Sequence, residues 1–255
     1  MTRLSVQDVS VARGGRTILG KVSAGFQSGA FVAVIGANGA GKSTLLSVLA
    51  GLIAPDAGQA RLDDRPLSEI KRPQLARRRA YLPQTPRCEW PISVERLVAL
   101  GLMPALPAFG GLPRDMLQRI DRVLTDCDLQ ARREQPVTTL SGGELARAML
   151  ARALVGDPDV LIADEPMAGL DPRHALDTAI RLRALADDGK LVIAAIHDLT
   201  FAARFSTHIL ALREGQVVAD GPTDATLTAA LLKQVFEVQA EVTGQGATAR
   251  IDFLS

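Results

Sequence analysis

The chain has 255 residues and a formal net charge of +1 at pH 7, with 47% hydrophobic and 22% charged residues. This composition excludes a disordered chain, a collagen-like repeat and a disulfide scaffold, and it is typical of an ordinary globular protein. Because the charge is nearly balanced, we expect no broad basic surface for the repeated phosphates of a nucleic acid.

The first 30 residues predict an antiparallel sheet. Residues 4–12 and 17–26 read as two strands, and the pair Gly14-Gly15 between them marks a turn. From Phe31 the pattern changes to an apolar strand at 31–36, a glycine-rich turn and a helical run at 42–52. This order opens a parallel α/β unit.

Residues 85–155 contain no clear strand pattern. Three stretches, 92–102, 116–129 and 142–155, carry helical spacing of apolar residues and predict helices. The Pro- and Gly-rich piece at 103–115 is interpreted as a surface loop, with a simple linker as the alternative. We therefore expect a helical subdomain inserted into the α/β core.

Apolar strands are predicted again at 159–164 and 190–197, with a helical stretch at about 172–185 between them. A hairpin is predicted at 208–221, and the tail beyond it is expected to hold one helix and little more. Alternation of strands and helices indicates an α/β fold with a doubly wound sheet. We treat residues 1–255 as one domain, in which 1–84 and 156–255 form the core and 85–155 the helical subdomain.

Two features bear on the cellular compartment. No apolar run approaches the ~20 residues that a membrane helix requires, and residues 1–15 lack the hydrophobic segment of a secretory signal. Cys88 and Cys127 form no CxxC pair, so we expect two small buried residues with free thiols in a reducing compartment. The sequence predicts a protein that does not span a bilayer and stays in the cytoplasm.

Residues 36–44 read GANGAGKST and match the GxxxxGK[ST] pattern of a phosphate-binding loop. The loop follows an apolar strand and opens a helix, so that backbone N–H groups and the positive helix end can face phosphate oxygens. Lys42 would supply a positive charge for the β and γ phosphates, and the Ser43 hydroxyl suits Mg²⁺. A glycine-rich structural turn is the alternative. The predicted ATP-binding residues of the loop are Gly36, Ala37, Asn38, Gly39, Ala40, Gly41, Lys42, Ser43 and Thr44.

Two carboxylates, Asp164 and Glu165, stand at the end of the strand at 159–164, at the sheet edge where α/β proteins bind their ligands. Asp164 is the natural partner for Mg²⁺, and Glu165 can orient or polarise an attacking water. His197 ends the next strand and could hold the γ phosphate and that water, although a lone histidine after a strand is more often only a satisfied polar residue. His174 and His208 are assigned no role.

The segments GANGAGKST, LSGGE at 140–144, VLIADEP at 160–166, AGLD at 168–171 and IHD at 196–198 occur in this order. With them the chain resembles the nucleotide-binding domains of ABC transporters over nearly its whole length. LSGGE carries the most weight, because phosphate-loop ATPases of other families lack it. The resemblance implies a P-loop NTPase core with an antiparallel β-subdomain and an inserted helical subdomain.

The resemblance also implies how the site is assembled. Two subunits would pack head to tail, each ATP lying between one phosphate loop and the partner's signature. Gln84 resembles the residue that contacts Mg²⁺ and water and links the core to the helical subdomain, and Asp171 resembles a residue that meets its counterpart across the interface. The signature residues acting on the partner's ATP would be Ser141, Gly142, Gly143 and Glu144.

One departure from the family concerns the base. The family commonly places an aromatic residue near the end of the first strand to stack on adenine, and this chain has Arg13 there. A guanidinium plane can stack on a ring, so Arg13 is the candidate base contact, with an exposed turn arginine as the alternative. Glu144 replaces the commoner glutamine of the signature and is an accepted variant.

The single cassette, the AYLPQ segment at 80–84, the loop at 103–115 and the short tail resemble ATPases of iron-siderophore, haem or cobalamin importers. The resemblance implies a homodimer at the cytoplasmic face of the inner membrane, two membrane-spanning permease subunits, an extracytoplasmic binding protein that acts indirectly, and no nucleic acid partner. An exporter with separate membrane subunits remains an alternative. A soluble ABC ATPase is less favoured, since no second cassette or coiled-coil insertion is visible, and an inactive module is least favoured, since Lys42, Glu165 and His197 are present.

Overall fold

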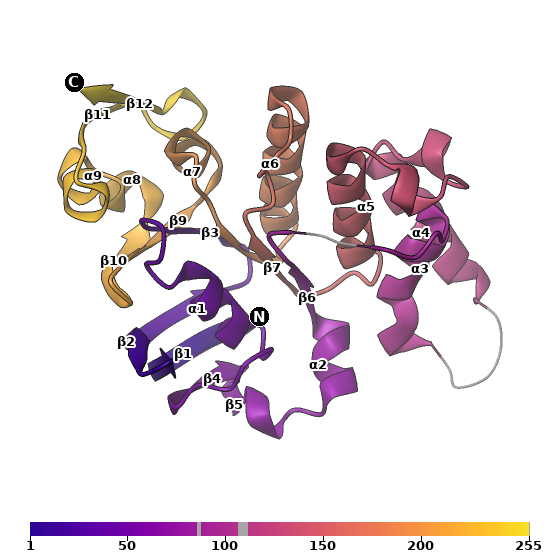
Figure 1. The fold of residues 1–255 in the computed structure, drawn as a ribbon, viewed down its shortest axis with the longest axis horizontal. Helices are drawn as coiled ribbons and strands as arrows, with labels where there is room; N and C mark the ends of the chain where they lie inside the picture. The colour runs from indigo at the N-terminus through magenta and orange to yellow at the C-terminus, as the bar shows by residue number, and fades with distance from the viewer. Residues whose placement is uncertain (86–87, 107–111, 255) are drawn as a thin grey trace.

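The computed structural model describes residues 1–85, 88–106 and 112–254. Within these ranges the strands form a four-stranded sheet, a six-stranded sheet and a two-stranded sheet. Figure 1 shows the helices α3, α4 and α5 grouped at one end of the molecule, beyond the edge strand β6. The α/β fold class predicted from the sequence is confirmed by this arrangement of parallel strands and helices.

The antiparallel sheet has the strand order β2-β1-β4-β5. Its strands are β1 (Arg3–Arg13), β2 (Arg16–Gln27), β4 (Ala57–Leu62) and β5 (Arg65–Pro66). The predicted hairpin of β1 and β2 is confirmed, with Arg13 directly opposite Arg16 at the turn. The sequence reading did not include β4 and β5, which lie beyond the helix that follows the phosphate loop.

The central sheet has the order β10-β9-β3-β8-β7-β6, and only β10 runs antiparallel to its neighbour. Its strands are β3 (Phe31–Ile35), β6 (Arg79–Leu82), β7 (Val160–Asp164), β8 (Leu191–Ala195), β9 (His208–Arg213) and β10 (Gln216–Pro222). All residues of β3, β7 and β8 are buried, because helices cover both faces of the sheet.

The two faces of β3 belong to two separate cores. Phe31 and Ile35 pack in the core that includes α6 (Pro172–Asp187) and α7 (Leu199–Phe205). Val32 and Val34 pack in the other core, with α1 (Lys42–Leu49) and the antiparallel sheet. Because α1 lies between the two sheets, the start of this helix is held in place from both sides.

The segment between β6 and β7 is helical in the described residues. It contains α3 (Val94–Ala99), η2 (Leu100–Ala105), α4 (Arg114–Asp126), η3 (Gln130–Arg132), η4 (Val137–Thr139) and α5 (Gly142–Leu154). The loop expected at 103–115 is shorter at both ends, since η2 includes Met103–Ala105 and α4 begins at Arg114. Residues 107–111 of that predicted loop lie outside the described residues. Before β6 come η1 (Leu67–Glu69) and α2 (Arg72–Arg78).

The expectation of one helix and little more in the tail is wrong. After β10 come α8 (Thr223–Thr226), α9 (Ala229–Phe236), β11 (Gln239–Thr243), η5 (Gly246–Thr248) and β12 (Arg250–Leu254), and the two strands pair with each other. Each strand buries few residues, Ala240 and Ile251 among them. Strands this short and mostly exposed leave a weak alternation in the sequence.

Both cysteine thiols are free, as expected. Cys127 is buried, and burial raises the pKa of its thiol to about 11, whereas Cys88 is only partly buried, contrary to expectation. Among the described helices, none combines the length and apolar character needed to cross a membrane.

Gly101 permits the close packing of η2 against α5. A Cβ atom at this position would lie 2.1 Å from the Arg152 carbonyl oxygen and 2.6 Å from Val155 Cγ1. Gly101→Ala is therefore expected to lower the free energy of unfolding by about 1–3 kcal/mol, the usual cost of overpacking.

Urea denaturation measures this effect. Gly20→Ala is the matched control, because its Cβ would meet only Thr17 Cγ2 at 3.8 Å. Equal midpoints for the two variants would contradict the packing argument.

Candidate nucleotide site

Residues 36–41 form the connection between β3 and α1, and residues 42–44 begin the helix. Gly41 precedes the helix with φ +100°, a left-handed conformation that other residues rarely adopt. Gly36 lies against the end of β9, where a Cβ would approach the Leu212 carbonyl oxygen to 2.4 Å. These two glycines let the loop curl at the start of α1, so that backbone N–H groups can converge on an anion.

Lys42 is the charged group inside this loop. Its side chain is buried, and Nζ donates to the carbonyl oxygens of Gly36 at 2.8 Å and Ala37 at 3.2 Å. Burial lowers the pKa of Lys42 below its usual value, while the carboxylates of Glu165 and Asp164 oppose the shift. A phosphate oxygen would give the ammonium group a stronger partner than two neutral carbonyls.

Asp164 ends β7 and faces the loop. Its side chain is buried, and its Oδ1 atom has no hydrogen-bond partner. Burial raises the pKa of this carboxyl, and the neighbouring Ser43 hydroxyl opposes the shift. An unpartnered buried oxygen is costly, so this atom is suited to a cation that arrives with the ligand.

The donor set fits Mg²⁺. The described part of the chain has no group of three or more His, Cys, Asp and Glu side chains that could hold a metal by themselves. A hydroxyl from Ser43, a carboxylate from Asp164 and the amide oxygen of Gln84 are hard oxygen ligands, and Mg²⁺ takes its remaining ligands from phosphates and water. The residues present therefore fit a metal ion bound together with a nucleotide.

Glu165 connects three neighbouring strands at the edge of the sheet. It follows β7, and it accepts hydrogen bonds from Gln84 Nε2 at 2.8 Å and from the His197 ring. Gln84 follows β6 and His197 follows β8, the strands on either side of β7. Glu165 itself has φ +53°, an unusual conformation for a glutamate, which marks a constrained turn.

The start of α5 is a second helix end with free N–H groups. Ser141 is its N-cap and forms a capping box with Glu144, whose Oε2 accepts from the Ser141 backbone N–H at 2.9 Å. This bond is the main reason that the pKa of Glu144 is lowered. A Cβ at Gly142 would meet open space, so the helix start is accessible. Figure 1 places α5 apart from α1, with β6 and β7 between them.

Asp171 caps the start of α6. Its side chain accepts from the His174 backbone N–H at 3.1 Å and pairs with the His174 ring, and this pairing lowers the pKa of Asp171. His174 is assigned no role from the sequence, and in the structure its ring holds the Asp171 side chain at the start of α6. Likewise His208, also left without a role, pairs with Asp220 across the β9–β10 hairpin.

The arginine that borders the phosphate loop is not the one predicted from the sequence to contact the base. Arg13 is exposed at the end of β1, and Arg16, directly opposite in β2, lines a hollow of about 810 Å³ beside residues 37–40. The sequence could not separate the two arginines, because both flank the same turn.

Comparison with known proteins places the chain in a family. A family model of ABC transporters matches residues 19–168. Hemin import ATP-binding protein HmuV of Rhodopseudomonas palustris strain HaA2 is 39% identical over 249 residues, which cover 94% of this chain and 93% of that protein. The protein of the same name from Thermobifida fusca is 36% identical, covering 96% and 86% of the two chains.

Solved structures show the same fold. A metal-chelate type ABC transporter in an inward-facing conformation matches with a TM-score of 0.84 at 22% identity, covering 100% of this chain and 97% of that one. A dimeric ATP-binding cassette in a post-hydrolysis state, bound to ADP and phosphate, matches with a TM-score of 0.78 at 25% identity, covering 86% and 98%. The chain therefore belongs to the ABC transporter family, as one of its ATP-binding and ATP-hydrolysing subunits.

Proposed function

We propose that this chain hydrolyses Mg-ATP between two copies of itself and thereby drives an importer of iron-containing chelates, with haem as the first candidate. The relatives named hemin import ATP-binding proteins support haem, at 36–40% identity over nearly the whole chain. The observation that carries the hydrolytic part is the cluster of Gln84, Glu165 and His197 beside the unpartnered Asp164 oxygen.

In this proposal the chain's own groups have separate tasks. Residues 36–44 bind the phosphates through backbone N–H groups, and Lys42 turns from its carbonyl partners to the β and γ phosphates. Ser43, Asp164 and Gln84 would hold Mg²⁺, which when bound neutralises charge on the phosphates. Glu165 orients the attacking water and accepts its proton, and His197 holds the γ phosphate and that water.

The partner chain completes the site. The start of α5, with Ser141, Gly142, Gly143 and Glu144, is an accessible helix end that suits the γ phosphate bound by another copy. Asp171 would meet its counterpart across the same interface. Because each ATP needs two chains, closure of the dimer would depend on ATP binding. The cassette dimer bound to ADP and phosphate supports such a pair.

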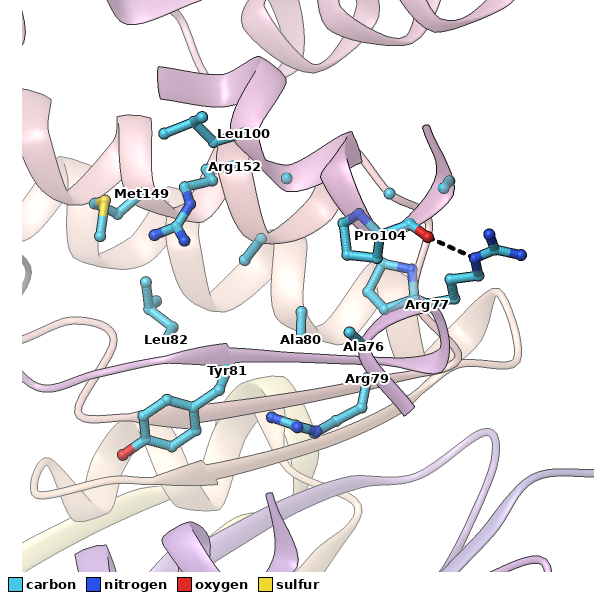
Figure 2. Close-up of a pocket in the computed structure, with 15 residues that line it drawn as sticks. Ala76, Arg77, Arg79, Ala80, Tyr81, Leu82, Leu100, Pro104, Met149 and Arg152 are labelled. Carbon is cyan, nitrogen blue, oxygen red and sulfur yellow. Dashed lines mark hydrogen bonds between the residues drawn. The ribbon is translucent and has the colours of Figure 1, made fainter. Parts of the chain in front are cut away.

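We further propose that membrane-spanning permease subunits dock at the edge strand β6. A hollow of about 260 Å³ lies between this strand and the helices of residues 85–155. Figure 2 shows Ala80 and Leu82 on the side of β6 that faces Leu100 and Met149, with Tyr81 on the other side.

The rim of this hollow suits a protein partner. Arg152 projects into it from α5, and Arg77 Nε donates to the carbonyl oxygen of the lining residue Pro104 at 2.6 Å. Met103 does not line the hollow itself, but it precedes Pro104 in η2 and is 61% exposed. β6 ends at Leu82, and Gln84 lies only two residues further along the chain. Movement of a permease segment bound in this hollow would therefore shift Gln84, which contacts the nucleotide site. We place the assembled protein at the cytoplasmic face of the inner membrane, with an extracytoplasmic binding protein that delivers the substrate.

Glu165→Gln tests the hydrolytic role. The amide keeps the size of the side chain but has only one acceptor oxygen and cannot accept the proton of water, so turnover is expected to fall by ~100-fold or more. ATP binding should be retained, and an ATP-bound dimer should accumulate.

Steady-state hydrolysis and size-exclusion chromatography with ATP measure both effects. Glu69→Gln, an exposed glutamate in η1, is the control. Unchanged turnover would remove Glu165 from its proposed role.

Met103→Glu tests the docking surface. A charge at this exposed apolar position is expected to abolish stimulation of hydrolysis by the membrane partner, while the free chain's own turnover stays unchanged. Leu52→Glu is the matched control, because Leu52 is 53% exposed and, unlike Met103 beside Pro104, has no neighbour in the chain that lines the hollow. Equal stimulation of ATP hydrolysis in the two variants by the membrane partner would contradict docking at this hollow.

Co-isolation from membranes tests the transport assignment. The chain is expected to purify with a polytopic membrane protein, and vesicles that hold the complex should accumulate haem when ATP is supplied. Lys42→Ala serves as the inactive control. Association with ribosomes or DNA-repair proteins in place of a membrane protein would contradict transport and leave the ATPase assignment standing.

A further inference from the structure

The phosphate loop borders a hollow on the side away from Glu165. The hollow measures about 810 Å³ and lies against residues 37–40, Arg16 at the start of β2, Arg213 at the end of β9, and Phe236 at the end of α9. In the sheet, β9 and β8 flank β3 on opposite sides. The β9–β10 turn therefore lies on one side of the loop, and His197 and Glu165 lie on the other.

This arrangement sets the direction of a bound nucleotide. The terminal phosphate belongs beside Glu165, Gln84 and His197, where water would attack it. The triphosphate follows the loop, so the nucleoside must leave toward the opposite side. The hollow lies there, and its volume is within the range of small-molecule sites.

Phe236 is the aromatic side chain among the residues that line the hollow. It is partly buried and packs against the larger core, and it also borders the hollow. Arg213 braces this end of α9, because its guanidinium donates to Glu237 Oε1 at 2.9 Å and to the Gln234 carbonyl oxygen. A ring held in this way is a platform on which a nucleobase can stack.

Arg16 supplies a second group with affinity for a base. Its side chain is exposed, and it takes part in no ion pair or side-chain hydrogen bond within the described ranges. A free guanidinium can stack on a heterocycle or donate to its ring nitrogens. Arg213, by contrast, is already engaged by Glu237.

We propose that Phe236 and Arg16 bind the purine base of the nucleotide, and that the end of α9 thereby takes the place of an aromatic residue in the first strand. The inference rests on the proposed function, because it assumes that ATP occupies the phosphate loop. It gives the end of α9 a role in nucleotide binding, although this segment lies outside all of the sequence motifs of the family. Arg13 lies opposite Arg16 but outside the lining of the hollow, so its contribution should be smaller.

The test compares two ligands that share the phosphates and differ in the base. Binding of Mg-ATP and of Mg-tripolyphosphate is measured by calorimetry on the full chain and on Phe236→Leu and Arg16→Gln. Each variant is expected to bind ATP about five- to ten-fold more weakly, as for the loss of one stacking partner, and to bind tripolyphosphate as the wild type does. Phe236→Trp should retain ATP binding.

Two variants serve as matched controls. Phe253→Leu removes an aromatic ring that is 60% exposed in β12, outside the hollow, and should leave both ligands unaffected. Arg13→Gln removes the arginine across the hairpin and should change ATP binding less than Arg16→Gln does. Because Arg16 is exposed, its variant tests the base contact without disturbing the core around Phe236.

Three results would overturn the inference. These are unchanged ATP binding in both variants, an equal loss of ATP and tripolyphosphate, and a wild type that binds ATP no better than tripolyphosphate. Failure of the proposed function looks different, because the wild type would then bind neither ligand.

Discussion

The parallel pairing of β3, β8, β7 and β6 is the constraint on which the rest of the site depends. β3, β7 and β8 are buried on both faces, and the carboxyl ends of all four strands meet at one edge of the sheet. The phosphate loop, His197, Glu165 and Gln84 each follow one of these strands directly. A one-residue shift in the register of a strand would move its side chains from one core to the other, and it would turn the site residue at its end away from the others.

Burial of charge at this edge prepares the site for its ligand. Lys42 and Asp164 are both buried, and no ion pair joins them in the described residues. Burial moves the pKa of Lys42 down and that of Asp164 up, so each charged form is disfavoured without a partner. A triphosphate with Mg²⁺ would bring the opposite charge to both groups, and part of the binding free energy would then come from relief of this penalty.

The two helix starts are the reason that the proposed function requires a second copy. The start of α1 is enclosed between the two sheets, whereas the start of α5 is capped by Ser141 and Glu144 and opens to solvent. Both ends suit anions, yet they lie in different parts of one chain (Figure 1). Pairing two chains head to tail would bring one end of each kind to the same phosphates.

The sequence by itself determined the phosphate-loop motif, Asp164 and Glu165 at the end of β7, the strands β1, β2, β3, β7 and β8, the β9–β10 hairpin and the family resemblance, because these are local patterns of periodicity and spacing. The tertiary structure alone decided which distant residues meet, such as the contacts of Glu165 with Gln84 and His197. It also revealed β4, the tail strands β11 and β12, and the hollow that joins Arg16 to Phe236. Short, exposed strands carry a weak pattern, and a hollow between segments far apart in the chain has no signal in either segment, because it exists only once the sheets and helices have packed.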